Sequence, residues 1–343
     1  MPKRSRFTRR LSTCVKAVFF AALSLSPPAI SEELRYSYFR TGSAADSINP
    51  VTPGTVLMGG GEDVDAAMQW MCALSGNGDF LILRAAGTDA YNPYLKGICP
   101  NLNSVATLVI PSRTAANEPF VIDTIKKAEA IWIAGGNQSN YINNWKDTPV
   151  QAALNASIAQ GVPIGGTSAG LSVLTQFVYS AQQFNGINSS QALADPFHPQ
   201  ITLVRDFINI PFLEGVIGDP HVVIRDRMGR DFTFLCRIYQ NGWSREPRGI
   251  SVEARTALLI DSNGISRAVG DGSVYFLQAH GAPQSCSSKT PLSYRDITVY
   301  RIRQNEGSVN LNNWKGMHGR KYSVSVMKGT LISTPTDNNN YPY

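Results

Sequence analysis

The sequence predicts an α/β protein, in which a mostly parallel sheet has helices on both faces and a β-rich extension follows at the C-terminal end. Two observations carry this prediction. Short apolar runs alternate with segments of helical spacing from Gly54 to Ile260, and helices of this length connect parallel strands. Three of the runs end in glycines, at Gly59–Gly61, Gly135–Gly136 and Gly165–Gly166, so we expect their carboxyl ends to lie together.

The periodicity of the apolar residues places the individual elements. It predicts strands at residues 55–58, 80–85, 104–110, 130–134 and 162–164, and helices at 64–74, 121–128 and 150–160. Beyond Arg230 it predicts a helix at 232–239, strands at 250–252 and 257–260, and β-rich segments over 262–343. Residues 32–53 are expected to be irregular and the tail from Asp337 mobile. No repeat or clean boundary divides the chain, so we expect one domain over 32–343, with a core at about 54–260.

Residues 1–31 have the composition of a secretory signal peptide. They hold six of the 31 basic residues and no acidic residue, followed by an apolar stretch at 15–25 and the small-residue site Ala29-Ile30-Ser31. That stretch is shorter than the roughly 20 residues of a membrane span, so we expect cleavage after Ser31 and no stable membrane insertion. The rest of the chain has 25 basic and 25 acidic residues, so the net charge gives no support for a nucleic-acid partner. The expected location is periplasmic or extracellular.

Four cysteines remain after the expected cleavage, namely Cys72, Cys99, Cys236 and Cys286. An even number in an exported chain permits two disulfides in three connectivities, and buried free thiols are the alternative. We favour the pairing of neighbours, Cys72 with Cys99 and Cys236 with Cys286. No cysteine stands at metal-ligand spacing with a histidine, so no metal site is expected.

The sequence Gly166-Thr167-Ser168-Ala169-Gly170 is the strongest functional signal. It follows a short apolar run and precedes a helical pattern, as in the strand–turn–helix elbow that exposes a nucleophilic serine. The N–H group after the serine then faces the position of an oxyanion. The alternative is a glycine-rich turn with an incidental serine.

A serine nucleophile needs a base and a group that orients the base. His221 begins a segment with Arg225, Arg227 and Arg230 that is unusually rich in charge, and guanidinium groups can bind carboxylates. The alternative for this segment is a solvated charged helix. Glu253, after a short apolar strand, is a candidate for the orienting acid, or else a surface carboxylate.

Five motifs in order resemble those of peptidase family S51, the serine peptidases that include cyanophycinases and aspartyl dipeptidases. These are Gly59-Gly60-Gly61-Glu62-Asp63, Gly135-Gly136-Asn137-Gln138, the elbow, Asp219-Pro220-His221 with its three arginines, and Glu253 before Thr256-Ala257. The resemblance covers about residues 54–260. It implies a class I glutamine-amidotransferase-like (flavodoxin-like) fold and a peptidase activity without a cofactor.

The resemblance also implies a role for each matching residue. Ser168 would be the nucleophile, His221 the general base and Glu253 the orienting acid, with Gly136 and Ala169 supplying the oxyanion hole. The substrate pocket would be lined by Gln138, Thr167, Asp219, Arg225, Arg227 and Arg230. Family members release β-Asp-Arg dipeptides from cyanophycin, a poly-aspartate with arginine on each β-carboxyl. Arginines could clamp the carboxylates of such a dipeptide, and Asp219 could receive its guanidinium group.

This chain departs from the family pattern at Asn137, where aspartate is usual, and at Val222, where phenylalanine is usual. Other isoaspartyl or acidic dipeptides are therefore an alternative substrate class. An α/β-hydrolase esterase would use Asp261 and His280 instead, but no HGGG-type motif is present. A non-catalytic binding protein on a hydrolase scaffold is the third alternative, and a homodimer stays open.

Overall fold

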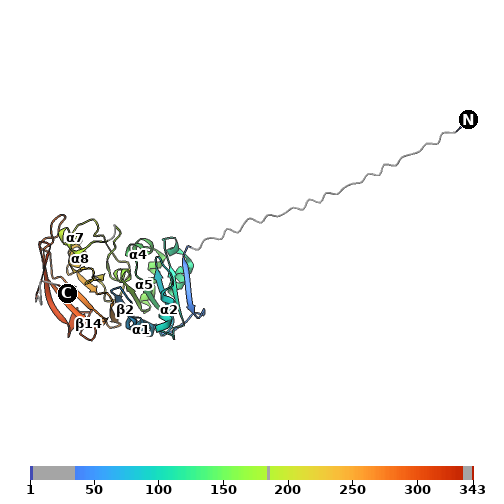
Figure 1. The fold of residues 1–343 in the computed structure, drawn as a ribbon, viewed down its shortest axis with the longest axis horizontal. Coiled ribbons are helices and arrows are strands. Elements are labelled where there is room, and N and C mark those ends of the chain that lie inside the picture. The colour runs from blue at the N-terminus through green and yellow to red at the C-terminus, as the bar shows by residue number, and fades with distance from the viewer. Residues whose placement is uncertain (3–34, 184–185, 335–341) are drawn as a thin grey trace. The chain divides into compact units, whose positions relative to one another are not determined.

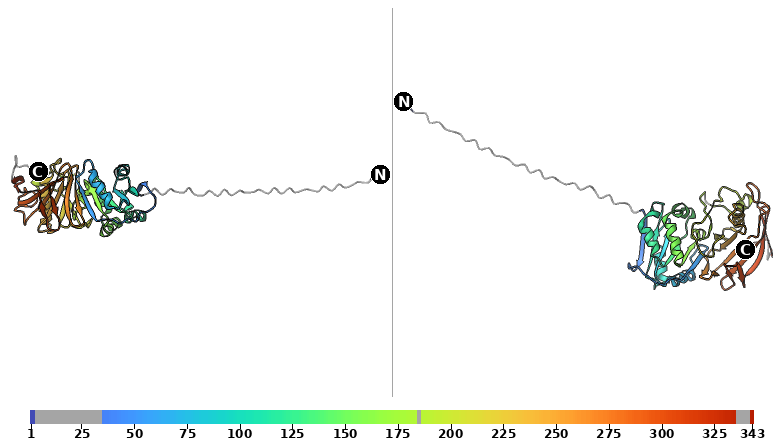
Figure 2. Two further views of the ribbon diagram at one scale, coloured as in Figure 1. Left: turned by 90° about the horizontal axis from the view of Figure 1, so that it is seen from below. Right: turned by 180° about the vertical axis from the view of Figure 1, so that it is seen from behind.

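The computed structural model of the chain describes residues 1–2, 35–183, 186–334 and 342–343. Residues 3–31 of the expected signal peptide and residues 337–341 of the expected mobile tail lie outside the described residues. Residues 35–343 form one compact unit with two β-sheets and helices packed on them (Figures 1 and 2). The α/β class predicted from the sequence is therefore confirmed.

The first sheet has ten strands in the order β1-β4-β3-β5-β6-β2-β11-β12-β15-β16. Five neighbours are parallel, namely β4 (Ser104–Val109), β3 (Asp79–Arg84), β5 (Ala130–Ile133), β6 (Ile164–Thr167) and β2 (Gly54–Met58). The others join antiparallel, namely β1 (Ser37–Gly42), β11 (Thr256–Asp261), β12 (Ile265–Gly270), β15 (Ser308–Asn310) and β16 (Lys315–Met317). The sheet is mixed rather than mostly parallel, because short turns such as the one at residues 262–264 return the chain without a crossover helix.

Helices cover both faces of the parallel strands, as the sequence predicts. Successive strand residues alternate between the faces, so that Val56 and Met58 pack on one side and Leu57 on the other. The first face is covered by α1 (Asp65–Leu74) and α2 (Tyr91–Ile98). The second is covered by α3 (Pro119–Lys126), α4 (Gln138–Trp145), α5 (Pro149–Ala159) and α6 (Ala169–Val173), with the 3-10 turn η1 (Ala115–Asn117) beside them.

The second sheet has eight strands in the order β18-β17-β14-β13-β10-β9-β7-β8. They are β18 (Thr330–Thr334), β17 (Arg320–Met327), β14 (Tyr294–Arg303), β13 (Ser273–Gln278), β10 (Arg248–Val252), β9 (Val216–Pro220), β7 (Phe177–Tyr179) and β8 (Leu203–Arg205). Helices α7 (Ser189–Ala194) and α8 (Met228–Gln240) pack on it around a separate apolar core (Figure 1). Strands β9 and β10 are parallel, so their carboxyl ends lie at the same edge of the second sheet.

The segment expected to be a C-terminal extension contributes to both sheets. Strands β12, β15 and β16 lengthen the first sheet, whereas β13, β14, β17 and β18 form four of the eight strands of the second. The chain passes from the second sheet to the first within Glu253–Arg255, between β10 and β11. This short passage brings the ends of the two sheets together at one place.

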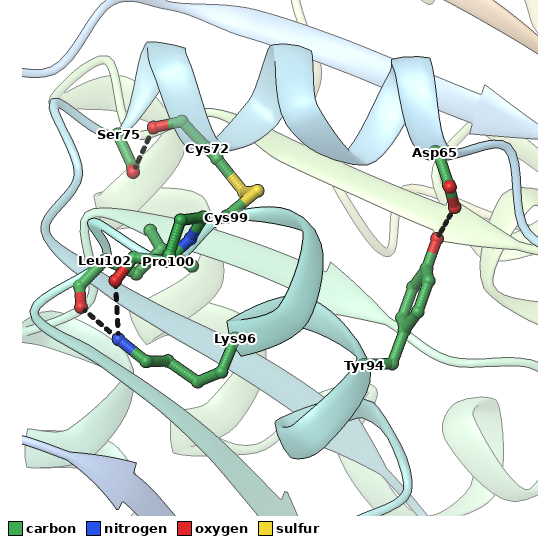
Figure 3. Close-up of a disulfide and its surroundings, with 8 residues drawn as sticks. All are labelled: Asp65, Cys72, Ser75, Tyr94, Lys96, Cys99, Pro100 and Leu102. Atoms are coloured by element: carbon green, nitrogen blue, oxygen red, sulfur yellow. Dashed lines mark hydrogen bonds between the residues drawn. A yellow bond between two sulfur atoms is a disulfide. The ribbon is translucent and has the colours of Figure 1, made fainter.

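Two disulfides join neighbouring cysteines, as predicted. Cys72 of α1 is bonded to Cys99 at the end of α2, with Cα atoms 6.5 Å apart (Figure 3). Tyr94 of α2 also donates a 2.6 Å hydrogen bond to Asp65 at the start of α1 (Figure 3). The second disulfide joins Cys236 of α8 to Cys286. Helices α1 and α2 are thus fixed to each other at two points.

Several elements were not predicted. Strand β1 lies in the segment expected to be irregular, and α2 lies in a region without a predicted helix. Helix α8 begins four residues before the predicted 232–239 segment. Pro342 and Tyr343, within the expected mobile tail, are packed against the unit. None of the helices in the described ranges is long and apolar enough to cross a bilayer.

Candidate active site

The predicted elbow is present. Ser168 stands between β6 and α6 with φ 54° and ψ −114°, a conformation that residues other than glycine adopt only under strain. The neighbouring glycines are required by space, because a Cβ atom on Gly170 would collide with the carbonyl oxygen of Ile133. The structure therefore explains the Gly-Thr-Ser-Ala-Gly sequence as a tight strand–helix turn with the serine at its apex.

Ser168 and His221 form a hydrogen-bonded pair, with Oγ and Nε2 2.8 Å apart. His221 follows β9 of the second sheet, so the two residues come from different sheets. Both are attached to the end of β2: Ser168 N–H donates to the Met58 carbonyl and His221 N–H donates to the Gly59 carbonyl, each at 3.0 Å. The carboxyl ends of the strands meet as predicted, and the end of β2 fixes Ser168 relative to His221.

The environment of His221 keeps its imidazole neutral. Burial, together with the positive charges of Arg225 and Arg227, lowers the pKa of His221 to about 4. A neutral imidazole can accept the hydroxyl proton at Nε2 when Nδ1 carries the ring hydrogen. The pair therefore has the geometry and the charge state of a serine nucleophile with its general base.

This pKa sets an expected pH profile. Because the neutral form of His221 is the active one, kcat/KM should hold down to about pH 5 and fall only as the pH drops through about 4. The variant Arg225→Gln removes a nearby positive charge, so its acid limb should move to higher pH. The variant Arg205→Gln, at an exposed arginine beside Asp206, should leave the limb in place. An acid limb near the usual histidine value of about 6.5 in the wild type would contradict this account.

Glu253 is far from Ser168 and His221 in the sequence, and its carboxylate is held by a different partner. Its backbone N–H donates to the Ser273 carbonyl at 3.1 Å, and its Oε1 accepts a 2.7 Å hydrogen bond from the hydroxyl of Tyr275. Within the described ranges, no hydrogen bond joins Glu253 to His221. The structure brings Glu253 to the site, and its role as the orienting acid stays a prediction.

Asp219 and Arg230, expected in the substrate pocket, bind each other instead. The Arg230 guanidinium donates to both oxygens of the Asp219 carboxylate, with Nε to Oδ2 at 2.7 Å, and both residues are only 3% exposed. A third donor, Nη1, contacts the Ile187 carbonyl, and the ring of Tyr179 lies against the guanidinium. Neither charge is accessible to a substrate, which corrects the predicted role of both residues.

The buried pair explains the ionisation of its neighbours. Burial alone would raise the pKa of Asp219, but Arg230 and Arg227 hold it below its usual value. Burial, together with the charge of Asp219, raises the pKa of Asp231 well above its usual value. Asp231 also accepts a 2.6 Å hydrogen bond from Ser251 of β10. The charged cluster therefore attaches α8 to β9 and β10, close to His221.

Two arginines remain beside the histidine. Arg227 is partly buried. Its Nη1 donates to the Pro220 carbonyl at 2.9 Å and lies 3.7 Å from Asp219 Oδ1. Arg225 is exposed, and the hydrogen bonds and ion pairs found in the described ranges leave its guanidinium unengaged. Ile224, next to it, is 74% exposed. Arg225 is therefore the predicted arginine most able to meet a substrate carboxylate.

The remaining predicted residues surround the elbow. Ala169 begins α6 directly after Ser168, and Gly136 follows β5 in the turn that precedes α4. Gln138, the first residue of α4, donates to the Tyr179 carbonyl at 3.2 Å. The hydroxyl of Thr167 is buried without a hydrogen-bond partner in the described part of the chain. Asn137, where the family usually has aspartate, caps α4 by accepting from Ser139 N–H.

Asp261 and His280, the residues that an α/β-hydrolase esterase would use, form hydrogen bonds with other partners. Asp261 accepts from the backbone of its own turn, at Asn263 and Ile265, and His280 contacts the hydroxyl of Thr298. In the described ranges neither is hydrogen-bonded to Ser168. The same part of the chain holds no group of three or more His, Cys, Asp or Glu side chains placed to bind a metal. The prediction that no cofactor is needed stays a prediction.

Two residues that shape the site, Tyr275 and Tyr343, were not predicted from the sequence, whereas Gly60 lies within a predicted motif. Gly60 lies against His221 and Ser168, and Tyr275 holds Glu253. Tyr343 contacts the segment after His221. The Gly59–Gly61 sequence marks a strand end that was expected near the site, but nothing in the sequence pattern linked Tyr275 to Glu253, 22 residues away, or Tyr343 to Val222, 121 residues away.

Comparison with known proteins finds a peptidase family that matches part of this chain. Residues 56–194 match the model of peptidase family S51, a segment that includes Ser168 but ends before His221. The cyanophycinase of Synechococcus elongatus is 21% identical over 203 residues, which cover 59% of this chain and 58% of that protein. The cyanophycinase of Geminocystis herdmanii is 23% identical over 51% of this chain and 60% of its own length. The chain thus matches well under two thirds of these relatives.

Among solved structures, a peptidase from an acI-B1 Actinobacterium has a TM-score of 0.47 with 17% identity, covering 68% of this chain and 96% of its own. The family match supports the resemblance that the five sequence motifs indicate.

Proposed function

Since residues 56–194 match peptidase family S51, we propose that this chain is a cyanophycinase-like serine exopeptidase that works through an acyl-enzyme. The observation that carries the proposal is the 2.8 Å contact of Ser168 Oγ with His221 Nε2 at a strained elbow. A class I glutamine-amidotransferase-like fold is part of the same proposal, supported by five adjacent parallel strands and an elbow after β6.

In the proposed reaction, His221 Nε2 takes the hydroxyl proton while Ser168 Oγ bonds to the carbonyl carbon of the scissile amide. The N–H groups of Ala169 and Gly136 stabilise the negative charge that develops on the carbonyl oxygen. The imidazolium returns its proton to the leaving nitrogen, and the C–N bond breaks. Water, activated by His221, then hydrolyses the ester and restores Ser168.

We propose cyanophycin as the first substrate. The curated relatives that match this chain bear the name cyanophycinase, and the exposed Arg225 suits a substrate rich in carboxylates. Arg227, on the same segment, would contribute charge at somewhat greater depth. The expected products are β-Asp-Arg dipeptides.

One observation favours a second candidate. Arg230 occupies both carboxylate oxygens of Asp219, so the acid that was expected to receive the arginine side chain of the substrate is already paired. A site without that acid would still bind a substrate carboxylate at Arg225. Peptidase activity on other isoaspartyl or acidic dipeptides is therefore the second candidate.

Export to the periplasm or the cell exterior is part of the proposal. The basic and apolar pattern of residues 1–31 supports it, and so do the two disulfides, which persist mainly in oxidising compartments.

The test is mass spectrometry of the soluble products after incubation with insoluble cyanophycin, beside a Ser168→Ala variant. Release of β-Asp-Arg by the wild type alone is the expected result. Cleavage of β-aspartyl dipeptides without any release from cyanophycin would move the activity to the second candidate. Equal release by the Ser168→Ala variant would overturn the assignment of the nucleophile.

A further inference from the structure

The segment that follows His221 has no capping side chain of its own. Residues 221–227 form turns, with Arg225 N–H donating to the His221 carbonyl at 3.2 Å and Arg227 N–H donating to the Val222 carbonyl at 2.8 Å. Helix α8 begins at Met228, and Arg227, at the N-cap position, makes no side-chain cap hydrogen bond. The first N–H groups of a helix lack partners within the helix, so this end needs an acceptor from elsewhere.

Two side chains from other elements supply acceptors: Ser189 Oγ accepts from Arg230 N–H at 3.3 Å, and Tyr343 accepts at the first residue of the helix. The Tyr343 hydroxyl oxygen accepts from Met228 N–H at 3.1 Å. The hydroxyl proton can be donated to the Val222 carbonyl at 3.1 Å or to Asp226 Oδ1 at 3.0 Å. One phenol therefore bridges the beginning, the middle and the end of the segment that links His221 to α8. Burial raises the pKa of Tyr343, so the phenol keeps its proton throughout the working pH range.

The ring of Tyr343 contacts the other side of the site. It packs edge-on against Tyr275, with ring centroids 5.9 Å apart, and the Tyr275 hydroxyl donates to Glu253. The backbone beside it is also attached, because the Tyr322 hydroxyl of β17 donates to the Pro342 carbonyl at 2.7 Å. Tyr343 thus lies between the segment that follows His221 and Tyr275 of β13, the residue that holds the Glu253 carboxylate.

We propose that Tyr343 is a positioning residue for the Ser168–His221 pair, acting by fixing the 221–228 segment that carries His221, Arg225 and Arg227. The inference rests on the proposed function. His221 itself makes a single side-chain hydrogen bond in the described ranges, to Ser168, so the backbone of this segment largely sets where its ring points. A shift of about 1 Å between a nucleophile and its base can lower a rate by about 100-fold.

The test uses the variant Tyr343→Phe, which keeps the ring and removes the hydroxyl. The matched control is Tyr294→Phe, whose buried hydroxyl donates to the Gly281 carbonyl at 2.9 Å, away from the histidine segment. The readout is the second-order rate at which a fluorophosphonate modifies Ser168, followed by intact mass across the pH range. This probe needs a working nucleophile and base but no knowledge of the substrate.

We expect Tyr343→Phe to lower the rate at neutral pH by about tenfold or more, while Tyr294→Phe keeps the wild-type rate. Looser packing would also admit water to His221, whose charged neighbours are Asp219, Arg225, Arg227 and Arg230, so the acid limb should move up from about pH 4. A purely structural role would lower the melting temperature and leave both the rate and the limb of the folded protein unchanged, which would overturn the proposal.

If Tyr343→Phe fails to fold, a second variant tests the proposal. Tyr322→Phe removes the attachment of Pro342 and leaves the Tyr343 hydroxyl in place, so it should lower the labelling rate in the same direction by a smaller factor. A wild-type rate in folded Tyr322→Phe would then overturn the inference. Failure of the proposed function looks different, because the wild type itself would not be labelled at Ser168.

Discussion

Replacement of His221 by alanine is expected to lower kcat/KM by at least about 10⁴-fold with little change in the fold. The imidazole is the group within hydrogen-bond distance of Ser168 Oγ that can take its proton, at 2.8 Å. Removing it leaves the hydroxyl with no general base, although the elbow and the oxyanion donors would remain. The measurement is the steady-state rate at which the dipeptide product is released, and circular dichroism checks that the variant is folded.

The matched control for this variant is His280→Ala. His280 contacts the Thr298 hydroxyl at 3.1 Å and would be the base only in the α/β-hydrolase alternative. We expect His280→Ala to retain wild-type turnover. Loss of activity in His280→Ala together with full activity in His221→Ala would reverse the assignment.

Gly60→Ala is expected to lower kcat/KM by about 100-fold. A Cβ atom at Gly60 would lie 2.5 Å from His221 Nε2 and 3.0 Å from Ser168 Cβ, both far inside van der Waals contact. The pair would have to separate to accommodate the methyl group. Turnover and the rate of Ser168 phosphonylation should fall together, because both depend on that contact.

Gly61→Ala isolates the steric effect from backbone strain. Gly60 and Gly61 have nearly the same φ, at +88° and +85°, so alanine is strained to a similar degree at both. At Gly61, however, the new methyl group would have its nearest neighbours at 3.5 Å, on Ala254 and Arg255. We expect Gly61→Ala to stay close to wild-type activity. Equal losses in the two variants would mean that strain, and not the contact with His221 and Ser168, causes the defect.

Much of the fold was predictable where the signal is local. The strand before Ser168, the elbow and the convergence of three glycine-ended strands follow from apolar runs and glycine sequences. The second sheet was not predicted, because strands such as β7 and β8 have three residues each and pair with partners far along the chain. Pairing at such distances leaves little trace in a window of ten residues.

In the candidate site, too, features with a local sequence signal were predictable, whereas features that depend on distant contacts were not. Ser168 and His221 can each be recognised from the few residues around them, and the structure brings the two side chains together. The three arginines carry the same charge in the sequence, yet Arg230 is buried on Asp219 eleven residues away while Arg225 faces solvent. Burial decides which charge can meet a substrate, and spacing along the chain does not report burial. Tyr343 illustrates the extreme, since it contacts a segment more than a hundred residues before it.

The most direct test of the central claim, that Ser168 is an activated nucleophile, is intact mass spectrometry after treatment with a fluorophosphonate, followed by peptide mapping. We expect one adduct per chain, located on the peptide that contains Ser168, absent in Ser168→Ala and formed far more slowly in His221→Ala. A folded wild-type protein that forms no adduct, or a Ser168→Ala variant that forms the same adduct, would contradict the account and favour a non-catalytic binding protein on this fold.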